Sequence, residues 1–585
     1  MRVGPLLRPS ILMALSAIVV LIGAVRIVLS YAQTGQAFDE PCHVAAGMEF
    51  LAKGTYLLDP VHPTLARIAI ALPLRLAGER YPDLAATDPD SHNYNVVGNH
   101  ILYDSGHLLR NLVLARLGVL PFFLLGAFVV YLWTRELGDD LAATIAVFLY
   151  TTTPPILAFS SIAYTDIVAA STQLAAMFTF YRWLQRPDVG RTVWLGFTLG
   201  IALLAKLTTV LFVPTAALGI VAVWYFRERS RPSRISFATA RMLAAVALAA
   251  VIVWAGYRFS MRPLQEATGI TASSMPSFQN FPHAVRKSAQ AVVLWNPRLP
   301  APELLHGVAL AWALNRLGSA SYLLGQIKSG GWWYFYLLAL GVKLPLPMLL
   351  MFGAAIFALL KYKETSMLFP LAALGAVLLI TLHVSYQVGM RHILVAVLLI
   401  TIVSGLGIGT LVRRTNGLAV AGIAIVALLV WQAGESAAAQ SDFLAYFNEF
   451  AGKDPSYVLV TGCDLDCGQD LFRLARELHA RNTSQCTLLV WSSADITRSN
   501  LPVNEMENPA LENSTALHGC VALSSRAFRL GDVFHHSYGP GYFSWLNNYQ
   551  PVANVGRTIR LYEIPQRVGT QEDVRDLNSI SSSRK

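Results

Sequence analysis

The sequence predicts a multi-pass α-helical membrane protein, and three observations support this class. Of the 585 residues, 54% are hydrophobic and only 14% are charged, whereas soluble domains carry about 25% charged residues. The mean hydropathy is +0.48. The apolar residues also gather in long runs, and a helix needs about 20 of them to cross a bilayer. A soluble globular protein is therefore excluded.

The apolar runs divide the chain into about eleven expected spans. The first run, Ile11 to Tyr31, is longer than the apolar core of a cleaved signal peptide. Arg2 and Arg8 precede it and predict a cytoplasmic N-terminus. The expected spans are residues 11–31, 112–132, 141–157, 166–184, 192–206, 208–226, 239–257, 332–360, 367–384, 392–411 and 417–434.

The net charge of +10 does not indicate a nucleic-acid-binding protein. The basic residues lie in short clusters between the apolar runs, such as RERSRPSR (Arg227 to Arg234) and KYKE (Lys361 to Glu364). Clusters of this kind mark cytoplasmic loops. The stretch 192–226 must hold two short helices, since a single helix there would invert the orientation of everything after it.

With this orientation, three large regions face outward, namely residues 32–110, 258–331 and 435–585. The last region is less apolar. Its pattern predicts strands at Tyr457 to Thr461, Thr487 to Trp491 and Thr558 to Ile564 and a helix at Gln469 to Arg481. We therefore expect a transmembrane domain over 1–434, a small extracytoplasmic α/β domain over 435–570, and a mobile polar tail over 571–585.

The cysteines indicate an oxidising compartment. All five lie in regions expected outside the membrane, where disulfides form. The number is odd, so at least one thiol is unpaired or pairs elsewhere. Cys463 and Cys467 are spaced for a local disulfide, which we favour over two free thiols or a metal site, because a second ligand pair is missing.

The acidic pair Asp39-Glu40, in FDEPCHVAAG, follows the first span directly. Acidic side chains beside a bilayer are costly unless a site uses them. A carboxylate at this rim can act as a general base toward an acceptor hydroxyl or amine. The structural alternative is a helix N-cap, because Pro41 favours the first turn of a helix.

Further candidates lie near the same membrane face. His62 and Arg67, in HPTLAR, suit either a phosphate contact or an interfacial anchor. Asp166, at the outer end of the fourth span, is either an intramembrane functional acid or a helix cap. Lys206, among apolar residues, needs an anionic partner, which is either a phosphate or Asp166 itself.

Arg391 and His392 begin the tenth span and serve either the same anion or the interface, by snorkelling. Two acids and several cations thus converge on one rim. This layout suits a lipid-phosphate donor that meets an acceptor at one membrane face, with the phosphate on Lys206 and Arg391. Cations there stabilise the charge that develops on a phosphate leaving group.

Three runs of the chain resemble a known superfamily. FDEPCHVAAGMEFLAKGTYLLDPVHPTLARIAIALPL resembles the first outer loop of the glycosyltransferase 39 and protein mannosyltransferase-like superfamily. SYLLGQIKSGGWWYFYLLALGVKLPLP is similar to the GGWWYY…KTPLP signature of a bacterial branch. YFNEFAGKDPSYVLVTGCDLDCGQDLFRLARELHA is similar to that branch's NLDWGQDL element. Together they are spread over most of the chain.

The resemblance implies a C-type (GT-C) glycosyltransferase fold in a bacterial inner membrane, with the C-terminal domain periplasmic. It implies a polyprenyl-phosphate sugar donor, a lipid, glycan or protein acceptor, and inversion at the anomeric carbon. The superfamily's base falls on Asp39, its later acid on Asp166, and the phosphate-contacting lysine of aminoarabinose transferases on Lys206. His62-Pro63-Thr64 and the two cysteines at 463 and 467 depart from the pattern.

We therefore expect Asp39 to deprotonate the acceptor while Lys206, with Arg391 and His62, holds the leaving polyprenyl phosphate. Glu40 is expected either as a second acid or as part of the first helical turn. A divalent metal (Mg or Mn) is a possible cofactor, because acids and His43 cluster there. A transporter or lipid-linked sugar flippase is the rival class, and an assembly or receptor protein is a third reading.

Overall fold

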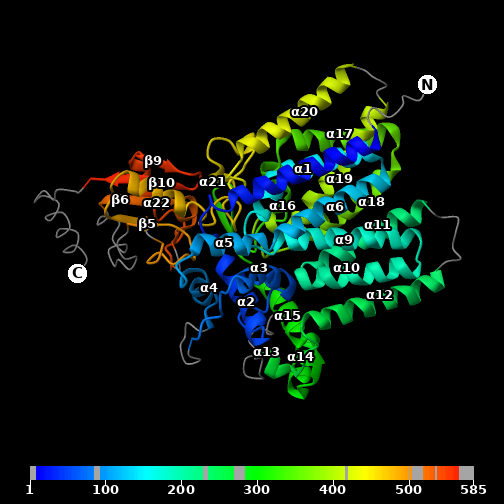
Figure 1. Cartoon of the computed structure of the whole chain (residues 1–585), viewed down its shortest axis with the longest axis horizontal. Helices are drawn as coiled ribbons and strands as arrows, with labels where there is room; N and C mark the ends of the chain where they lie inside the picture. The colour runs from blue at the N-terminus through cyan, green and yellow to red at the C-terminus, as the bar shows by residue number, and fades with distance from the viewer. Residues whose placement is uncertain are drawn as a thin grey trace, which may run out of the picture.

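The computed structural model describes residues 8–84, 92–227, 235–268, 283–414, 419–499, 501–502, 518–533 and 536–565. The expected tail over 571–585, Arg2 and most of the RERSRPSR cluster lie outside these residues. The long helices run side by side in one bundle, and the shorter helices and the main sheet gather at one end of it (Figure 1).

The bundle helices are α1 (Pro9–Ser30), α6 (Leu120–Leu137), α7 (Asp140–Thr152), α9 (Asp166–Gln185), α10 (Val189–Ala205), α11 (Thr209–Arg227), α12 (Ile235–Gly256), α17 (Leu346–Tyr362), α18 (Leu368–Thr381), α19 (Leu394–Arg414) and α20 (Ala419–Ala438). Within the described ranges, six helical segments are long and apolar enough to cross a membrane, or eight if each of two bent pairs is one span. Each expected span overlaps a helix among the described residues, and the number eleven remains a prediction.

Two of the expected spans differ from a straight helix. The expected span 332–360 is two helices, α16 (Phe335–Lys343) and α17, bent by 113°. Pro345 causes the break, because the residue before a proline avoids helical geometry and Leu344 is extended (φ −88°, ψ 140°). The same effect at Pro154 bends α7 by 62° against α8 (Pro154–Ser160).

The stretch 192–226 does form two helices, as predicted. They are α10 and α11, and Lys206, in the break between them, is extended with φ −162° and ψ 143°.

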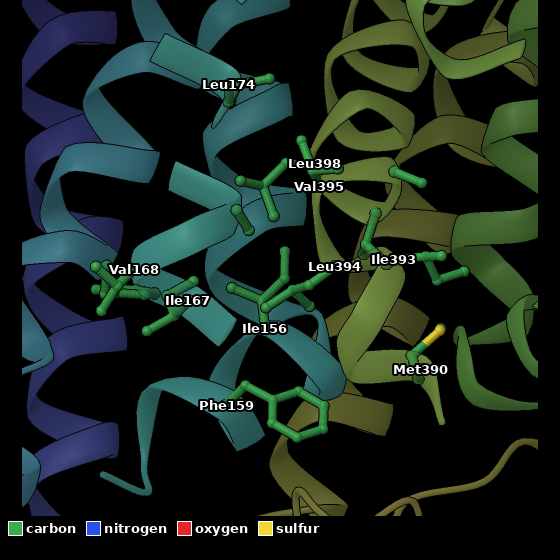
Figure 2. Close-up of a cluster of buried hydrophobic side chains, with 14 of the residues drawn as sticks. Ile156, Phe159, Ile167, Val168, Leu174, Met390, Ile393, Leu394, Val395 and Leu398 are labelled. Atoms are coloured by element: carbon green, nitrogen blue, oxygen red, sulfur yellow. The ribbon is translucent and has the colours of Figure 1, made fainter. Parts of the chain in front are cut away.

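The core of the bundle surrounds α19. Every residue of this helix from Leu394 to Thr410 is buried. Figure 2 shows Leu394, Val395 and Leu398 of α19 facing apolar side chains of α8 and α9. The outer helices α1, α12 and α20 instead expose apolar side chains, among them Leu21, Leu243 and Val420. That pattern suits helices that face lipid.

The end of the bundle beside the main sheet carries the connecting helices. They are α2 (Glu40–Lys53), α3 (Thr64–Leu76), α4 (Tyr94–Tyr103), α5 (Leu108–Leu117), α13 (Leu264–Thr268), α14 (His283–Trp295) and α15 (Pro302–Leu317). Strands β1 (Met261–Pro263) and β2 (Arg298–Pro300) pair antiparallel across the segment that holds α13 and α14, and β3 (Ala320–Leu323) and β4 (Gln326–Ser329) form a short hairpin. Two 3₁₀ turns, η4 (Thr365–Met367) and η5 (Met390–Ile393), precede α18 and α19.

The C-terminal region contains a four-stranded sheet in the order β5-β6-β10-β9. The strands are β5 (Cys486–Leu489), β6 (Gly519–Ser524), β9 (Ala553–Val555) and β10 (Ile559–Ile564), and only β5 and β6 are parallel. Helix α22 (Leu471–Ala480) packs on it through Leu471, Leu474 and Leu478. The other elements are η6 (Glu449–Ala451), α21 (Pro455–Val458), α23 (Ser525–Leu530), β7 (Asp532–Val533), β8 (His536–Ser537) and η8 (Ser544–Asn548).

The predicted strands at 487–491 and 558–564 correspond to β5 and β10, and the predicted helix at 469–481 to α22. The strand predicted at Tyr457 to Thr461 is wrong. Asp454 caps a helical turn there, by accepting the Ser456 amide at 3.1 Å, and Pro455 begins the turn. Only Leu459 makes a strand-like bridge, to Leu323.

The cysteines form two disulfides and leave one free thiol. Cys463 and Cys467 are bonded, as favoured from the sequence. Cys486 and Cys520 link β5 to β6, a pairing that the sequence analysis left open. Cys42 is free and buried.

Candidate active site

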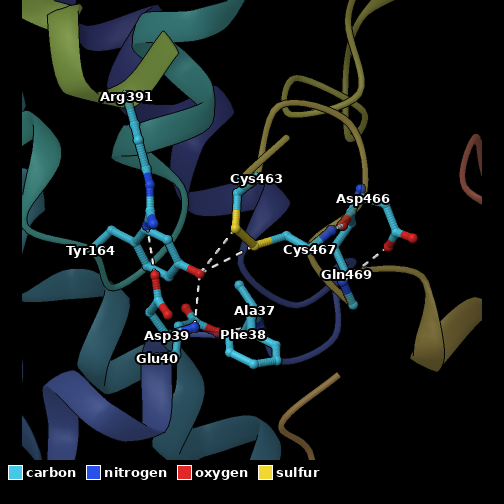
Figure 3. Close-up of a disulfide and its surroundings, with 12 residues drawn as sticks. Ala37, Phe38, Asp39, Glu40, Tyr164, Arg391, Cys463, Asp466, Cys467 and Gln469 are labelled. Carbon is cyan, nitrogen blue, oxygen red and sulfur yellow. Dashed lines mark hydrogen bonds and ion pairs between the residues drawn. A yellow bond between two sulfur atoms is a disulfide. The ribbon is translucent and has the colours of Figure 1, made fainter. Parts of the chain in front are cut away.

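Asp39 lies directly before α2 but does not cap it through its side chain. Its carboxylate instead pairs with Arg391, with Nη1 2.6 Å from Oδ2. Figure 3 shows this pair at the end of α2. The side chain of Asp39 is 29% exposed and that of Arg391 is 17% exposed. The pair is therefore held by the fold yet open to a reactant.

Tyr164 joins the two halves of this pair. Its hydroxyl accepts the Asp39 backbone N–H at 2.8 Å, and the Arg391 guanidinium lies 5.4 Å from its ring centroid. The same hydroxyl lies 3.3 Å from Cys463 Sγ and 3.1 Å from Cys467 Sγ. No pattern in the sequence singled out Tyr164, although it lies two residues before Asp166.

Glu40 occupies a different environment from its neighbour. It is completely buried and meets Arg116, also completely buried, at 2.7 and 2.8 Å. Its two oxygens also accept the N–H groups of Ala163 (2.9 Å) and Ala37 (2.8 Å). Paired and hydrogen-bonded in this way, the charge is well satisfied. Arg116 was not among the sequence candidates, although an arginine within an apolar run indicates a buried ion pair.

Asp166 and Lys206 form the second ion pair of the site. Lys206 Nζ lies 2.5 Å from Asp166 Oδ1, and both side chains are buried. Of the two partners considered for Lys206 from the sequence, the structure shows Asp166. The Asp166 carboxylate is close enough to interact electrostatically with Arg391. Lys206 interacts in the same way with His62 and His392. The two pairs thus belong to one charged cluster.

Arg67 is not exposed to a ligand. Its side chain is completely buried and pairs with Asp59, and its Nη1 donates to the Asp59 carbonyl at 3.0 Å. The Cys42 thiol donates to Asp59 Oδ2 at 3.3 Å. Burial raises the pKa of Cys42 well above its usual value, which keeps this proton in place. Asp59, at the centre of the group, was not selected from the sequence.

His62 is the exposed member of this group, with its side chain 27% exposed. Its Nδ1 lies 3.1 Å from Arg67 Nη2 and 3.4 Å from Asp59 Oδ2. A guanidinium can only donate, so Nδ1 accepts and the ring proton is assigned to Nε2. Burial lowers the pKa of His62, although Asp59 opposes the shift. His62 is therefore a neutral hydrogen-bond donor at neutral pH.

His43 and His392 complete the set of sequence candidates. The ring of His43 is edge-on to His62 and to Tyr164, at centroid distances of 5.4 Å. Burial, and then the Arg67 charge, hold the pKa of His43 well below its usual value. His392 Nδ1 lies 3.4 Å from the Tyr336 hydroxyl. Both histidines line the cluster without forming an ion pair.

A divalent metal does not fit these side chains as they are arranged. Among the residues that the structure describes, no group of three or more His, Cys, Asp and Glu side chains could hold a metal ion. Asp39 and Asp166 each already face a cation. No step proposed below therefore uses a metal.

The comparison with family models supports the resemblance seen in the sequence. A model described as dolichyl-phosphate-mannose-protein mannosyltransferase matches residues 110–254. That segment contains Arg116, Asp166 and Lys206, but neither Asp39 nor Arg391. Over these residues the chain is similar to a family of GT-C membrane glycosyltransferases, as the three sequence runs predict.

Several solved structures are similar to the chain. ArnT from Cupriavidus metallidurans bound to undecaprenyl phosphate is 14% identical, with 95% of this chain and 99% of that chain covered and a TM-score of 0.47. The Archaeoglobus fulgidus oligosaccharyltransferase tethered to an acceptor peptide is 14% identical, covering 73% and 55%, with a TM-score of 0.41.

The S. cerevisiae protein O-mannosyltransferase Pmt1-Pmt2 complex bound to the sugar donor is 16% identical and covers 46% of this chain, with a TM-score of 0.34. The match spans 37% of the length of that yeast chain. Comparison with curated protein sequences gives no significant match.

Proposed function

We propose that this chain is a membrane glycosyltransferase that moves a sugar from a polyprenyl-phosphate donor to an acceptor at the outer face of the membrane. One observation carries the proposal: the Asp39–Arg391 and Asp166–Lys206 pairs form one charged cluster where the bundle meets the connecting helices. A base, two cations and a hydrogen-bond donor then stand at the same site. The family match over residues 110–254 supports the reaction class.

The donor phosphate would compete with the two carboxylates for their cations. Its oxygens would draw Arg391 from Asp39 and Lys206 from Asp166, and His62 Nε2 would donate a further hydrogen bond. Charge-assisted hydrogen bonds of this kind are strong and specific for phosphate. Binding of the donor would thus free the Asp39 carboxylate for the acceptor.

In the transfer step, Asp39 takes the proton of the acceptor hydroxyl or amine. The acceptor atom bonds to the anomeric carbon, and the bond from that carbon to the phosphate oxygen breaks. The electron pair of that bond stays on the polyprenyl phosphate, where Arg391 and Lys206 stabilise the charge. Asp166 takes the role of holding Lys206, and Glu40 that of fixing α2 beneath Asp39.

The test is transfer of a labelled sugar from polyprenyl phosphate in membranes that contain the chain. Asp39→Asn should lower kcat by about 10²- to 10⁴-fold, the usual contribution of a general base, while the protein still inserts. Asp104→Asn is the matched control, because this acid is 52% exposed and pairs with Arg498 and His100, neither of which belongs to the cluster. Full activity of Asp39→Asn contradicts the assignment of the base. Movement of the donor lipid across the membrane without product supports a flippase.

A further inference from the structure

Four separate segments carry the two charged pairs of the site, and one loop of the C-terminal region contacts three of them. These three segments contribute Phe38, Tyr164 and Met390, each one or two residues before a site residue. The loop spans residues 463–467 and is closed by the Cys463–Cys467 disulfide; it is called the disulfide loop below. Figure 3 shows it facing Tyr164 and the Asp39–Arg391 pair.

The first contact holds the segment that leads into Asp39. The Phe38 N–H donates to the carbonyl of Cys467 at 3.0 Å, and the Gly35 N–H donates to that of Gln469 at 2.7 Å. The Phe38 ring stacks on Trp491 at a centroid distance of 3.9 Å. These contacts tie the segment to the disulfide loop and to the residues beside it.

The second contact is made by the disulfide itself. Both of its sulfur atoms lie against the Tyr164 hydroxyl, which accepts the N–H of Asp39 at 2.8 Å. Cys463 and Cys467 are 1% and 0% exposed. The buried disulfide thus packs against Tyr164, whose hydroxyl holds the backbone of Asp39, the proposed base.

The third contact fixes the start of α19. The Asp464 carboxylate accepts the N–H of Met390 at 2.9 and 3.1 Å, directly before Arg391. The carboxylate lies so close to the backbone of Gly389 that a Cβ there would clash with it. Gly389 has φ +91°, which favours glycine in any case.

Lys343 anchors the loop to the bundle. Its ammonium group donates to the carbonyl of Asp464 and to that of Leu444, the latter at 2.8 Å, and it is 2% exposed. Lys343 belongs to the KLPLP run and Asp464 to the GCDLDCGQDL run. Two motifs that the proposed chemistry leaves unused therefore meet at this loop.

We propose that the disulfide loop is a positioning element that sets the geometry of Asp39 and Arg391. Asp464 acts as a positioning residue through the Met390 N–H, and the disulfide acts through Tyr164 and Phe38. The consequence for sugar transfer rests on the proposed function. Since a misplacement of 1 Å can cost about 10²-fold in rate, a loosened loop lowers kcat even when every reacting side chain is present.

The chain offers a matched control for each part of the loop. The Cys486–Cys520 disulfide also lies in the C-terminal region, but it links β5 to β6. Asp470 is as buried as Asp464, yet it accepts hydrogen bonds from Thr558 and Arg557. Changes at these controls remove contacts within the C-terminal region and none with Phe38, Tyr164 or Met390.

The experiment uses the full chain in detergent and measures two quantities for each variant. The first is hydrogen exchange in peptides covering residues 36–40 and 388–394, which needs no substrate. The second is kcat for sugar transfer. The variants are Asp464→Ala, Asp464→Asn and Cys463→Ser with Cys467→Ser, and the controls are Asp470→Ala and Cys486→Ser with Cys520→Ser.

Asp464→Ala should speed exchange in 388–394 and lower kcat about 10- to 100-fold, with little change in KM for the donor. Asp464→Asn should keep most of the wild-type protection from exchange in 388–394 and most of the wild-type kcat, because its amide oxygen can still accept the Met390 N–H. The double serine variant at 463 and 467 should speed exchange in 36–40. Both control variants should leave hydrogen exchange in the two peptides and kcat unchanged at temperatures where the variants are folded.

The two proposals fail in different ways. Unchanged exchange in the loop variants, or equal changes in the controls, overturns the positioning role whether or not the chain transfers sugar. If the wild-type chain shows no transfer but exchange responds as expected, the loop positions these residues and the proposed function is wrong. Altered exchange with wild-type kcat also overturns the positioning role, because the geometry then does not control the reaction.

Discussion

Asp39 and Glu40 are adjacent in the sequence and face opposite environments. Asp39 reaches Arg391 at a partly exposed position, whereas Glu40 and Arg116 are sealed inside the protein. A buried charge that loses its partner is strongly destabilising, and a partly exposed one can recover hydration. Substitution of Glu40 should therefore mainly lower stability, and substitution of Asp39 should mainly lower activity.

Glu40→Gln should lower the free energy of unfolding by about 3–5 kcal/mol, because Arg116 is left without its countercharge. Asp39→Asn should cost less, yet remove more activity per folded molecule. Thermal unfolding of both purified variants measures the first effect, and transfer normalised to folded protein measures the second. Equal losses of stability would contradict this division between the two acids.

The Asp166–Lys206 pair allows a test of donor binding that keeps the charges balanced. Lys206→Met alone would leave the buried Asp166 carboxylate without a countercharge, so it is combined with Asp166→Asn. The double variant should bind polyprenyl phosphate about 10- to 100-fold more weakly, the worth of a charged hydrogen bond of about 1.5–3 kcal/mol. Direct titration with the lipid measures this affinity. Unchanged affinity would remove Lys206 from the phosphate site.

At the scale of elements, α2 and α3 are joined by the cluster around Asp59. Burial alone would raise the pKa of Asp59, but the Arg67 guanidinium and then His62 hold it well below its usual range. A depressed carboxyl pKa stabilises the fold at pH values above the unfolded pKa, and this stabilisation is lost as the pH falls through the folded pKa.

Asp59→Asn should therefore lower the Tm by a constant amount between about pH 5 and pH 8, and the gap to the wild type should narrow below about pH 4. Thermal scans of the purified proteins over this range provide the measurement. Asp83→Asn, at an exposed outer position, is the control and should show no gap. A gap that stays constant down to pH 3 would show that the carboxylate charge is not what stabilises this cluster.

Helices and the breaks between them could be predicted where neighbouring residues in the sequence determine them. Hydropathy placed helices over each expected span, and the break at Lys206 followed from the orientation of the basic loops. The bend at Pro345 was missed because the proline lies within a long apolar run. The turn at Pro455 was missed because the short run after it, Tyr457 to Thr461, has the composition of a strand.

The site candidates were selected from residue type, but their partners were not always foreseen. Asp39 and Arg391 are 352 positions apart and Glu40 and Arg116 are 76 positions apart. No periodicity encodes contacts at such separations. The Asp166–Lys206 pair was foreseen as one of two alternatives, because an isolated buried lysine requires an anion.

In the whole molecule, the connecting helices and the main sheet lie at one end of the bundle, and α1 begins toward the other end (Figure 1). The charged cluster lies at the end with the connecting helices, because Asp39 directly precedes α2. Arg135, Arg182 and Arg413 lie at helix ends among the loops expected in the cytoplasm, and each pairs with an acid there. Lys and Arg concentrate on the cytoplasmic side of membrane proteins. The site should therefore open on the outer face.

Labelling with a membrane-impermeant maleimide tests this orientation in sealed right-side-out vesicles. The native chain gives little background, because four cysteines are in disulfides and Cys42 is 5% exposed. Ala480→Cys, at the exposed end of α22, should label in intact vesicles. Arg186→Cys, whose native side chain is 76% exposed after α9, should label only after the membrane is permeabilised. The reverse pattern would put the two ion pairs on the cytoplasmic face, where a donor at the outer face could not reach them.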